Sequence, residues 1–239
     1  MHKHSRVFAG VLGAALMAGA VSPAMAADYN DGSAVGSQAD WNAWVSEWET
    51  VAADYTKVSL TPGADETQLN FAWYSKDADG EATPVVHFGT DRNALTAYTG
   101  TSAAVDTSLT DGVAYHTNQV TVTGLQENTT YYYTVEKNGV QTEPVTYKTG
   151  SFSNIKMLYV GDPQVGASKG QTQGSDELVA DAGAANTAAR NDSFGWNRTL
   201  EIATAQNPDL NFIISAGDQV NKTGQPKEEE YAGYLDPDA

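Results

Sequence analysis

The chain has 239 residues, a formal net charge of -17 and no cysteine. The absence of cysteine excludes disulfides, thiolate metal sites and a lipidated N-terminal cysteine. The strong negative charge disfavours nucleic-acid backbones and anionic lipid surfaces as partners, because both repel it. We attribute most of this charge to a well-solvated surface, and the functional alternative is attraction of multivalent cations.

The N-terminus has the pattern of a secretory signal. A short basic start at residues 2–6 precedes an apolar run over residues 7–21, and residues 24–26, Ala-Met-Ala, place small side chains where a signal peptidase cuts. We predict a signal peptide over residues 1–26, cleavage after Ala26, and a secreted protein. A transmembrane anchor is disfavoured because about 15 apolar residues fall short of the roughly 20 that span a bilayer. No later stretch is apolar enough to span.

A polar lead-in and a short helix are predicted over residues 27–56. Asp40 is a suitable N-cap, and Trp41, Trp44 and Trp48 follow it at i, i+3 and i+7. This spacing predicts an amphipathic helix. The tryptophan stripe favours packing of the helix onto its own domain, and the alternative is a surface that binds sugar rings.

Residues 57–150 have the alternation and turn residues of short β-strands. Strand-like runs occur at residues 68–74, 84–88, 115–122 and 143–149, with a strong hairpin signal at Asn138-Gly139. Gly124-Leu125, a short polar turn and then Thr129-x-Tyr131-x-Tyr133 resemble the fibronectin type III pattern. In that pattern the leucine covers the core beside a corner tyrosine. We therefore predict a fibronectin type III-like β-sandwich.

An α/β pattern begins after a polar linker at residues 151–154 and continues through residues 155–239. Residues 155–160 and 210–216 are nearly continuous apolar runs, typical of parallel strands buried on both faces. A helix is predicted between them at residues 194–206, which makes a right-handed βαβ unit. The segment at residues 166–190 is too long for an ordinary loop, and we expect a functional rim or disorder there.

Both predicted parallel strands end in Gly-Asp, at Gly161-Asp162 and Gly217-Asp218. Ligands bind at the carboxyl ends of strands in open parallel sheets, and neighbouring strands lie about 4.8 Å apart. The two carboxylates would therefore converge, and they repel one another unless a cation or a proton separates them. The glycines would let the backbone turn tightly. A single aspartate here is an ordinary turn residue, but the pair favours a metal site.

These Gly-Asp blocks resemble those of the calcineurin-like metallophosphoesterases. With the fibronectin-like domain in front, the chain resembles the purple acid phosphatase branch in a bacterial-type form. The resemblance implies hydrolysis of a phosphoester substrate with two divalent or trivalent metal ions, iron, zinc or manganese. It implies that Asp162 ligates the first metal and that Asp218 bridges both. Gln164 stands where many members have histidine, and Asn221 stands where the purple enzymes have a tyrosine ligand.

Both replacements weaken the implied ligand set. An amide oxygen is a poorer ligand than imidazole, so we expect Gln164 to hold a metal more weakly than histidine does at that position, or not at all. Because position 221 is Asn221 and not tyrosine, there is no phenolate for a purple iron(III) centre, and iron, zinc and manganese all stay compatible with the implied site.

The histidines of the family are also missing. Family members continue into Gly-Asn-His and Gly-His-x-His blocks, which complete the metal shells and supply the acid, whereas no histidine follows His116 in this sequence. His87 and His116 lie in predicted strands, where structural roles are expected. We therefore expect an N-terminal fragment of a longer enzyme, with no catalytic residue within the chain and little turnover alone.

Two alternatives belong to other functional classes. One is an exported β-sandwich binding module whose tryptophan helix contacts glycan or protein at the cell surface. The other is a calcium-dependent surface protein, which is disfavoured because no Asp-rich loop has calcium-ligand spacing.

Overall fold

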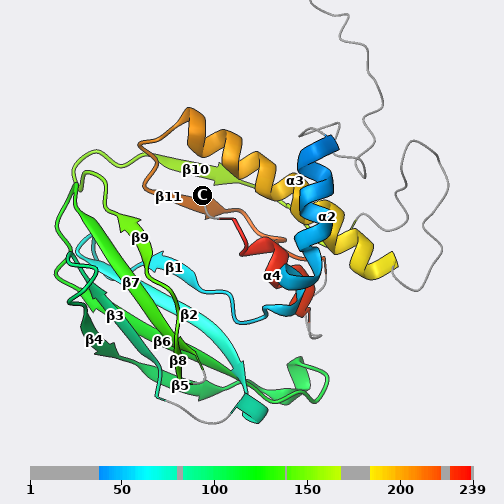
Figure 1. Ribbon diagram of the computed structural model, residues 1–239, viewed down its shortest axis with the longest axis horizontal. Helices are drawn as coiled ribbons and strands as arrows, with labels where there is room; N and C mark the ends of the chain where they lie inside the picture. Colours follow the sequence, from blue (N-terminus) through cyan, green and yellow to red (C-terminus); the bar gives the residue numbers. More distant parts are fainter. Residues whose placement is uncertain (1–37, 80–82, 138, 168–183, 222–226, 238–239) are drawn as a thin grey trace, which may run out of the picture.

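The computed structural model describes residues 38–79, 83–137, 139–167, 184–221 and 227–237. They form a β-sandwich and a smaller α/β unit, which lie side by side (Figure 1). The predicted signal peptide falls outside the described residues. Within the described part of the chain, no helix is long and apolar enough to cross a membrane.

Two antiparallel sheets build the sandwich. The first has the order β1-β2-β6-β5, with bounds Ser59–Pro62, Gln68–Lys76, Tyr115–Thr123 and Thr101–Ala104. The second has the order β4-β3-β7-β8, with bounds Thr96–Thr99, Val85–Gly89, Thr130–Lys137 and Val140–Gln141. Strand β9 (Val145–Lys148) also pairs with β7, and the short 3-10 helices η1 (Asp77–Asp79) and η2 (Thr107–Leu109) lie in connections. Strands are present at all four predicted runs, the long strand β7 follows the predicted corner, and the short strands β1, β4, β5 and β8 complete the two sheets.

The sandwich core comes from the alternation that the sequence shows. Phe71, Val86 and Val122 are completely buried between the sheets. At the predicted corner, Leu125 is buried, and the backbone N–H of Gln126 donates a hydrogen bond of 2.7 Å to the hydroxyl of Tyr131. The predicted tyrosine corner is therefore confirmed.

The α/β unit has the predicted order of strand, helix and strand. Strands β10 (Met157–Val160) and β11 (Phe212–Ser215) are parallel neighbours, joined through α3 (Ala184–Gln206) and followed by α4 (Glu228–Tyr234). Helix α3 begins ten residues before the predicted start at residue 194. The alanine-rich stretch at residues 184–189 favours helix, and Ala188 and Ala189 are buried. The predicted insertion is correspondingly shorter, and residues 168–183 lie outside the described part.

The expectation that both parallel strands are buried on both faces is wrong. Met157, Tyr159 and Ile214 are 48%, 71% and 38% exposed. Strand pairing places Tyr159 beside Ile214, so these side chains share one face of the sheet. Ile213, which points to the opposite face, is also 37% exposed, so neither face of this two-stranded sheet is fully covered by the described residues.

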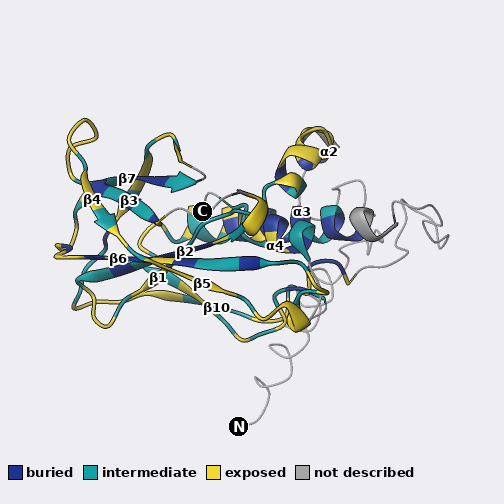
Figure 2. Cartoon of the chain, turned by 90° about the horizontal axis from the view of Figure 1, so that it is seen from below, coloured by how far each residue is buried: buried dark blue, intermediate teal, exposed yellow. Residues whose placement is uncertain are grey.

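Helix α2 (Gln38–Ala53) precedes the sandwich in sequence but crosses α3 and lies beside α4 (Figure 1). Its outer face is exposed and its inner face is buried (Figure 2). Trp44 and Trp48 are 8% and 2% exposed and share a hydrophobic cluster with Val165 and Phe194. The packing prediction is confirmed for these two tryptophans, and the side chain of Trp41 lies outside the description.

Helix α4 contacts the sandwich through an ion pair and a hydrogen bond, next to a cation–π contact. Lys76 Nζ lies 2.5 Å from Glu228 Oε1, and the hydroxyl of Tyr115 donates a hydrogen bond to the same carboxylate. The ammonium of Lys76 also lies 4.3 Å above the centre of the Tyr55 ring. The two units are therefore joined through α4 as well as through the linker.

Candidate site at the carboxyl ends of β10 and β11

The loops that follow β10 and β11 continue side by side beyond the strands. Val165 and Val220 form a parallel β-bridge. The N–H of Gln164 donates to the carbonyl of Asp218 at 2.8 Å, and the N–H of Asn221 donates to the carbonyl of Val165 at 3.0 Å. The predicted adjacency of the two Gly-Asp blocks therefore arises from the parallel pairing of β10 with β11 and from an isolated bridge beyond it in the same register.

Two side-chain amides bridge these loops. Gln164 Nε2 donates a hydrogen bond of 3.1 Å to Asp218 Oδ2, and Asn221 Nδ2 donates one of 3.2 Å to the carbonyl of Gly166. A carboxylate and a carbonyl only accept hydrogen bonds, so the NH₂ group of each amide must face its partner. The side chains of Asp162, Gln164 and Asp218 are exposed at this edge.

The backbone at this edge is strained. Asp162, Gln164 and Asp218 have φ angles of +33°, +41° and +43°, and they are three of the five non-glycine residues with positive φ in the described part of the chain. Such conformations cost on the order of 1–3 kcal/mol each and cluster at functional sites. This clustering is the local feature that most favours a functional edge.

The two glycines of the Gly-Asp blocks differ in what they permit. Gly217 has a φ of +126°, which L side chains rarely adopt, so the backbone there requires glycine. A Cβ added at Gly161 would meet nothing within 4 Å, and its φ is not in the left-handed region. The backbone therefore requires glycine at Gly217, whereas nothing among the described residues requires it at Gly161.

The described residues do not make a complete metal centre. Within the described ranges, no three His, Cys, Asp or Glu side chains gather in a group that could hold a metal ion. Asp162 and Asp218 offer carboxylate oxygens of the kind that Mg²⁺, Mn²⁺, Zn²⁺ and iron accept, and no described residue beside them completes a shell. The two described histidines pair with carboxylates of the sandwich, His87 with Glu136 at 2.8 Å and His116 with Asp77 at 2.6 Å, which agrees with the structural role expected for them.

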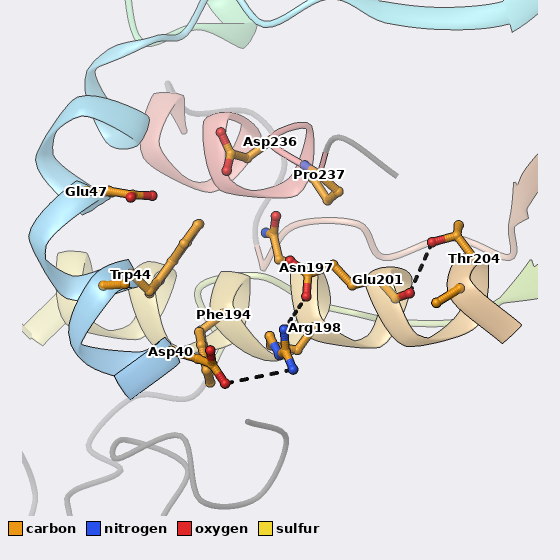
Figure 3. A pocket seen from close by; sticks show the side chains of 12 residues that line it. Asp40, Trp44, Glu47, Phe194, Asn197, Arg198, Glu201, Thr204, Asp236 and Pro237 are labelled. Atoms are coloured by element: carbon orange, nitrogen blue, oxygen red, sulfur yellow. Dashed lines mark hydrogen bonds and ion pairs between the residues drawn. The ribbon is translucent and has the colours of Figure 1, made fainter. Parts of the chain in front are cut away.

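A pocket of about 690 Å³ lies apart from this edge, between α2, α3 and the residues after α4 (Figure 3). None of the four predicted site residues lines it. Arg198 lies between Asp40, at 3.9 Å, and Glu201, to which it donates a hydrogen bond. Asp236 is paired with Lys57 at 2.6 Å. Most acidic groups of the pocket are therefore already paired within the protein.

Comparison with known proteins assigns the β-sandwich. Residues 55–152 match the family model described as the purple acid phosphatase N-terminal domain. The sandwich is similar to domains of this type. The chain also resembles the solved structure of purple acid phosphatase PPD1 from seeds of yellow lupin (Lupinus luteus), with 18% identity and a TM-score of 0.44 over 70% of this chain. It spans 29% of that lupin chain, and no curated protein sequence matches it.

The match to the family model ends at residue 152, so it does not include the α/β unit, which is defined only by its structure. Sequence reasoning missed Asp192 and Glu230, which lie against the loop after β10. Glu230 is the third member of an acidic run that predicts a solvated helix start. No sequence signal separates it from the two glutamates before it.

Proposed function

We propose that the chain is the N-terminal part of an exported two-metal phosphoester hydrolase, to whose metal centre Asp162 and Asp218 contribute. The observation that carries this proposal is the parallel pairing that brings both Gly-Asp blocks, with their positive φ angles, to one edge that follows a domain similar to the purple acid phosphatase N-terminal domain. Iron, zinc and manganese all suit the two carboxylates, and the substrate is a phosphoester.

Gln164 and Asn221 act in this proposal as positioning residues. The resemblance places both at ligand positions, but each uses its NH₂ group within the protein. Gln164 orients the carboxylate of Asp218, and Asn221 holds the carbonyl of Gly166. The remaining ligands would be the histidines that the resemblance implies, so we expect the 239-residue chain alone to show little phosphatase turnover.

Manganese binding tests the metal-centre proposal without relying on turnover. Bound Mn²⁺ broadens the NMR signals of nearby amides, and we expect the first signals lost from the secreted chain to be those around Asp162 and Asp218. Asp162→Asn and Asp218→Asn should each remove this effect, while Asp91→Asn in an exposed sandwich loop serves as the matched control. The proposal would be contradicted if both variants kept the same broadening of the amide signals, or if the broadening were spread evenly over the acidic surface.

The binding-module alternative loses its main feature. Trp44 and Trp48 are 8% and 2% exposed in the hydrophobic cluster between α2 and the α/β unit. Trp48 therefore presents no aromatic surface to glycan or protein, and Trp44 contributes only a small exposed area to the lining of the pocket. No other observation in the described residues favours that alternative.

A further inference from the structure

Gly166 is the point where the two site loops meet α3 and α4. Its N–H donates a hydrogen bond of 2.9 Å to Asp192 Oδ2 on α3, and its carbonyl accepts the bond from Asn221. The residue is buried and has a φ of +95°. It lies two residues after Gln164, which contacts Asp218.

Glu230 of α4 fills the space where a side chain at Gly166 would lie. A Cβ built on Gly166 would be 2.7 Å from Cδ and 2.9 Å from Cγ of Glu230, closer than real contacts allow. Glu230 is 7% exposed, and its Oε1 accepts a hydrogen bond of 3.1 Å from Lys227 Nζ. The buried side chain of Glu230 therefore packs directly against the backbone of Gly166.

The second carboxylate oxygen of Glu230 indicates that this residue has a role beyond filling space. Oε2 is buried and has no hydrogen-bond partner among the described residues. Buried polar atoms are nearly always paired, and an apolar side chain of similar size would fill this space without that cost. Violations of this kind concentrate at functional sites, and this one lies directly behind the proposed metal edge.

We propose that Asp192 and Glu230 are positioning residues that clamp Gly166 from two helices and thereby hold Gln164 against Asp218. Asp192 fixes the backbone by accepting its N–H, and Glu230 fixes it by contact. The functional meaning of the clamp rests on the proposed function above. The clamp itself is a property of the protein without metal and can be tested in that state.

Amide hydrogen exchange of the full secreted chain, measured by NMR without metal, tests the clamp. The N–H groups of Gln164, Val165 and Asn221 bond across the two loops, whereas the N–H of Ala216 bonds back to Val160 nearer the strands. Asp192→Ala and Glu230→Ala should each speed exchange about tenfold or more at the first three amides and leave Ala216 unchanged.

Two further variants separate positioning from general stability. Asp192→Asn keeps an oxygen that can accept the Gly166 N–H, so it should retain the protection that Asp192→Ala loses. Glu229→Ala changes the preceding residue of α4, and any effect it has should be uniform across all four amides. Exchange that stays unchanged in Asp192→Ala and Glu230→Ala, or that rises uniformly, overturns the proposal.

A double-mutant cycle tests the contact directly. Gly166→Ala places a methyl group against Glu230, and Glu230→Ala removes the three atoms nearest to it. The strain from the positive φ is present in both backgrounds and cancels in the cycle. Gly166→Ala should therefore lower the Tm clearly less in Glu230→Ala than in the wild-type chain, and equal losses would show that the contact is not specific.

These outcomes are independent of the manganese experiment. Loss of local protection without Asp-dependent manganese binding supports the clamp and contradicts the proposed function. Asp-dependent binding with unchanged local exchange supports the function and contradicts the clamp.

Discussion

The indole nitrogen of Trp44 donates a hydrogen bond of 2.8 Å to the backbone carbonyl of Arg190, which lies 146 positions further along the chain. The helix that precedes the β-sandwich is therefore part of the α/β unit that follows it. Its hydrophobic cluster includes Val165, the neighbour of Gly166 in the loop after β10. Order in space thus differs from order in sequence, and α2 supports the candidate site from behind.

Trp48→Ala should destabilise the protein strongly. The side chain is almost completely buried in the cluster between α2 and the α/β unit. Truncation of a buried tryptophan costs about 3–5 kcal/mol. Urea unfolding should show this loss, whereas Val45→Ala on the exposed face of the same helix should change stability by less than about 0.5 kcal/mol. Similar small effects for both variants would place Trp48 outside the core.

A chain that ends at Ser151 should keep the β-sandwich and expose α2. Without the α/β unit, Trp44 and Trp48 have no partner cluster, while Trp73 stays buried in the sandwich core. The tryptophan fluorescence of this chain should shift to longer wavelength. A matched piece of residues 57–151, which lacks α2 and keeps only Trp73, should not show this shifted emission. An unshifted spectrum for the longer piece would show that α2 folds back onto the sandwich.

Tyr131→Phe should lower the stability of the sandwich by about 0.5–1.5 kcal/mol, because it removes the hydroxyl that accepts the Gln126 N–H. The ring stays buried, so packing is retained. Thermal unfolding of the variant measures the loss. Tyr132→Phe removes a hydroxyl from the opposite face of β7 and should be nearly neutral. Equal effects of the two substitutions would remove the special role of the corner.

Local patterns in the sequence were sufficient to predict most of the sandwich. The alternation through Phe71 and Val122 and the Gly124-Leu125 corner are short-range signals that match their final environment. The packing partner of α2 was not predictable, because a tryptophan stripe shows which face is buried and not which unit covers it. The exposed face of β10 was missed for a similar reason. An apolar run shows the capacity for burial, while the number of neighbouring strands and helices decides it.

The candidate site was predictable only in part. Two apolar runs that each end in Gly-Asp indicated that Asp162 and Asp218 lie at one edge, and the strand pairing agrees. The hydrogen bond from Gln164 to Asp218 depends on a positive φ that glutamine seldom adopts, so no sequence pattern announces it. The contact of Glu230 with Gly166 depends on how α4 docks, which only tertiary packing determines.

Glu229→Gln should stabilise the protein at neutral pH and have no effect in acid. Burial raises the pKa of the Glu229 carboxyl above its ordinary value of 4.5. The negative charges of Glu230, Glu49 and Glu228 raise this pKa further, and the positive charge of Lys227 opposes them. The folded protein therefore binds this proton more tightly than the unfolded chain does, so the carboxyl lowers stability as pH rises from 4.5 through its raised folded-state pKa.

Glutamine mimics the protonated form at every pH. The difference in unfolding free energy between Glu229→Gln and the wild type should therefore be near zero below about pH 4, grow through the window above pH 4.5, and stay constant once the folded carboxyl is ionised. Urea unfolding at a series of pH values measures it, with Glu143→Gln at an exposed position as the matched control. A gain in unfolding free energy of the same size at every pH would mean that the substitution acts through packing and that ionisation of Glu229 does not destabilise the folded protein.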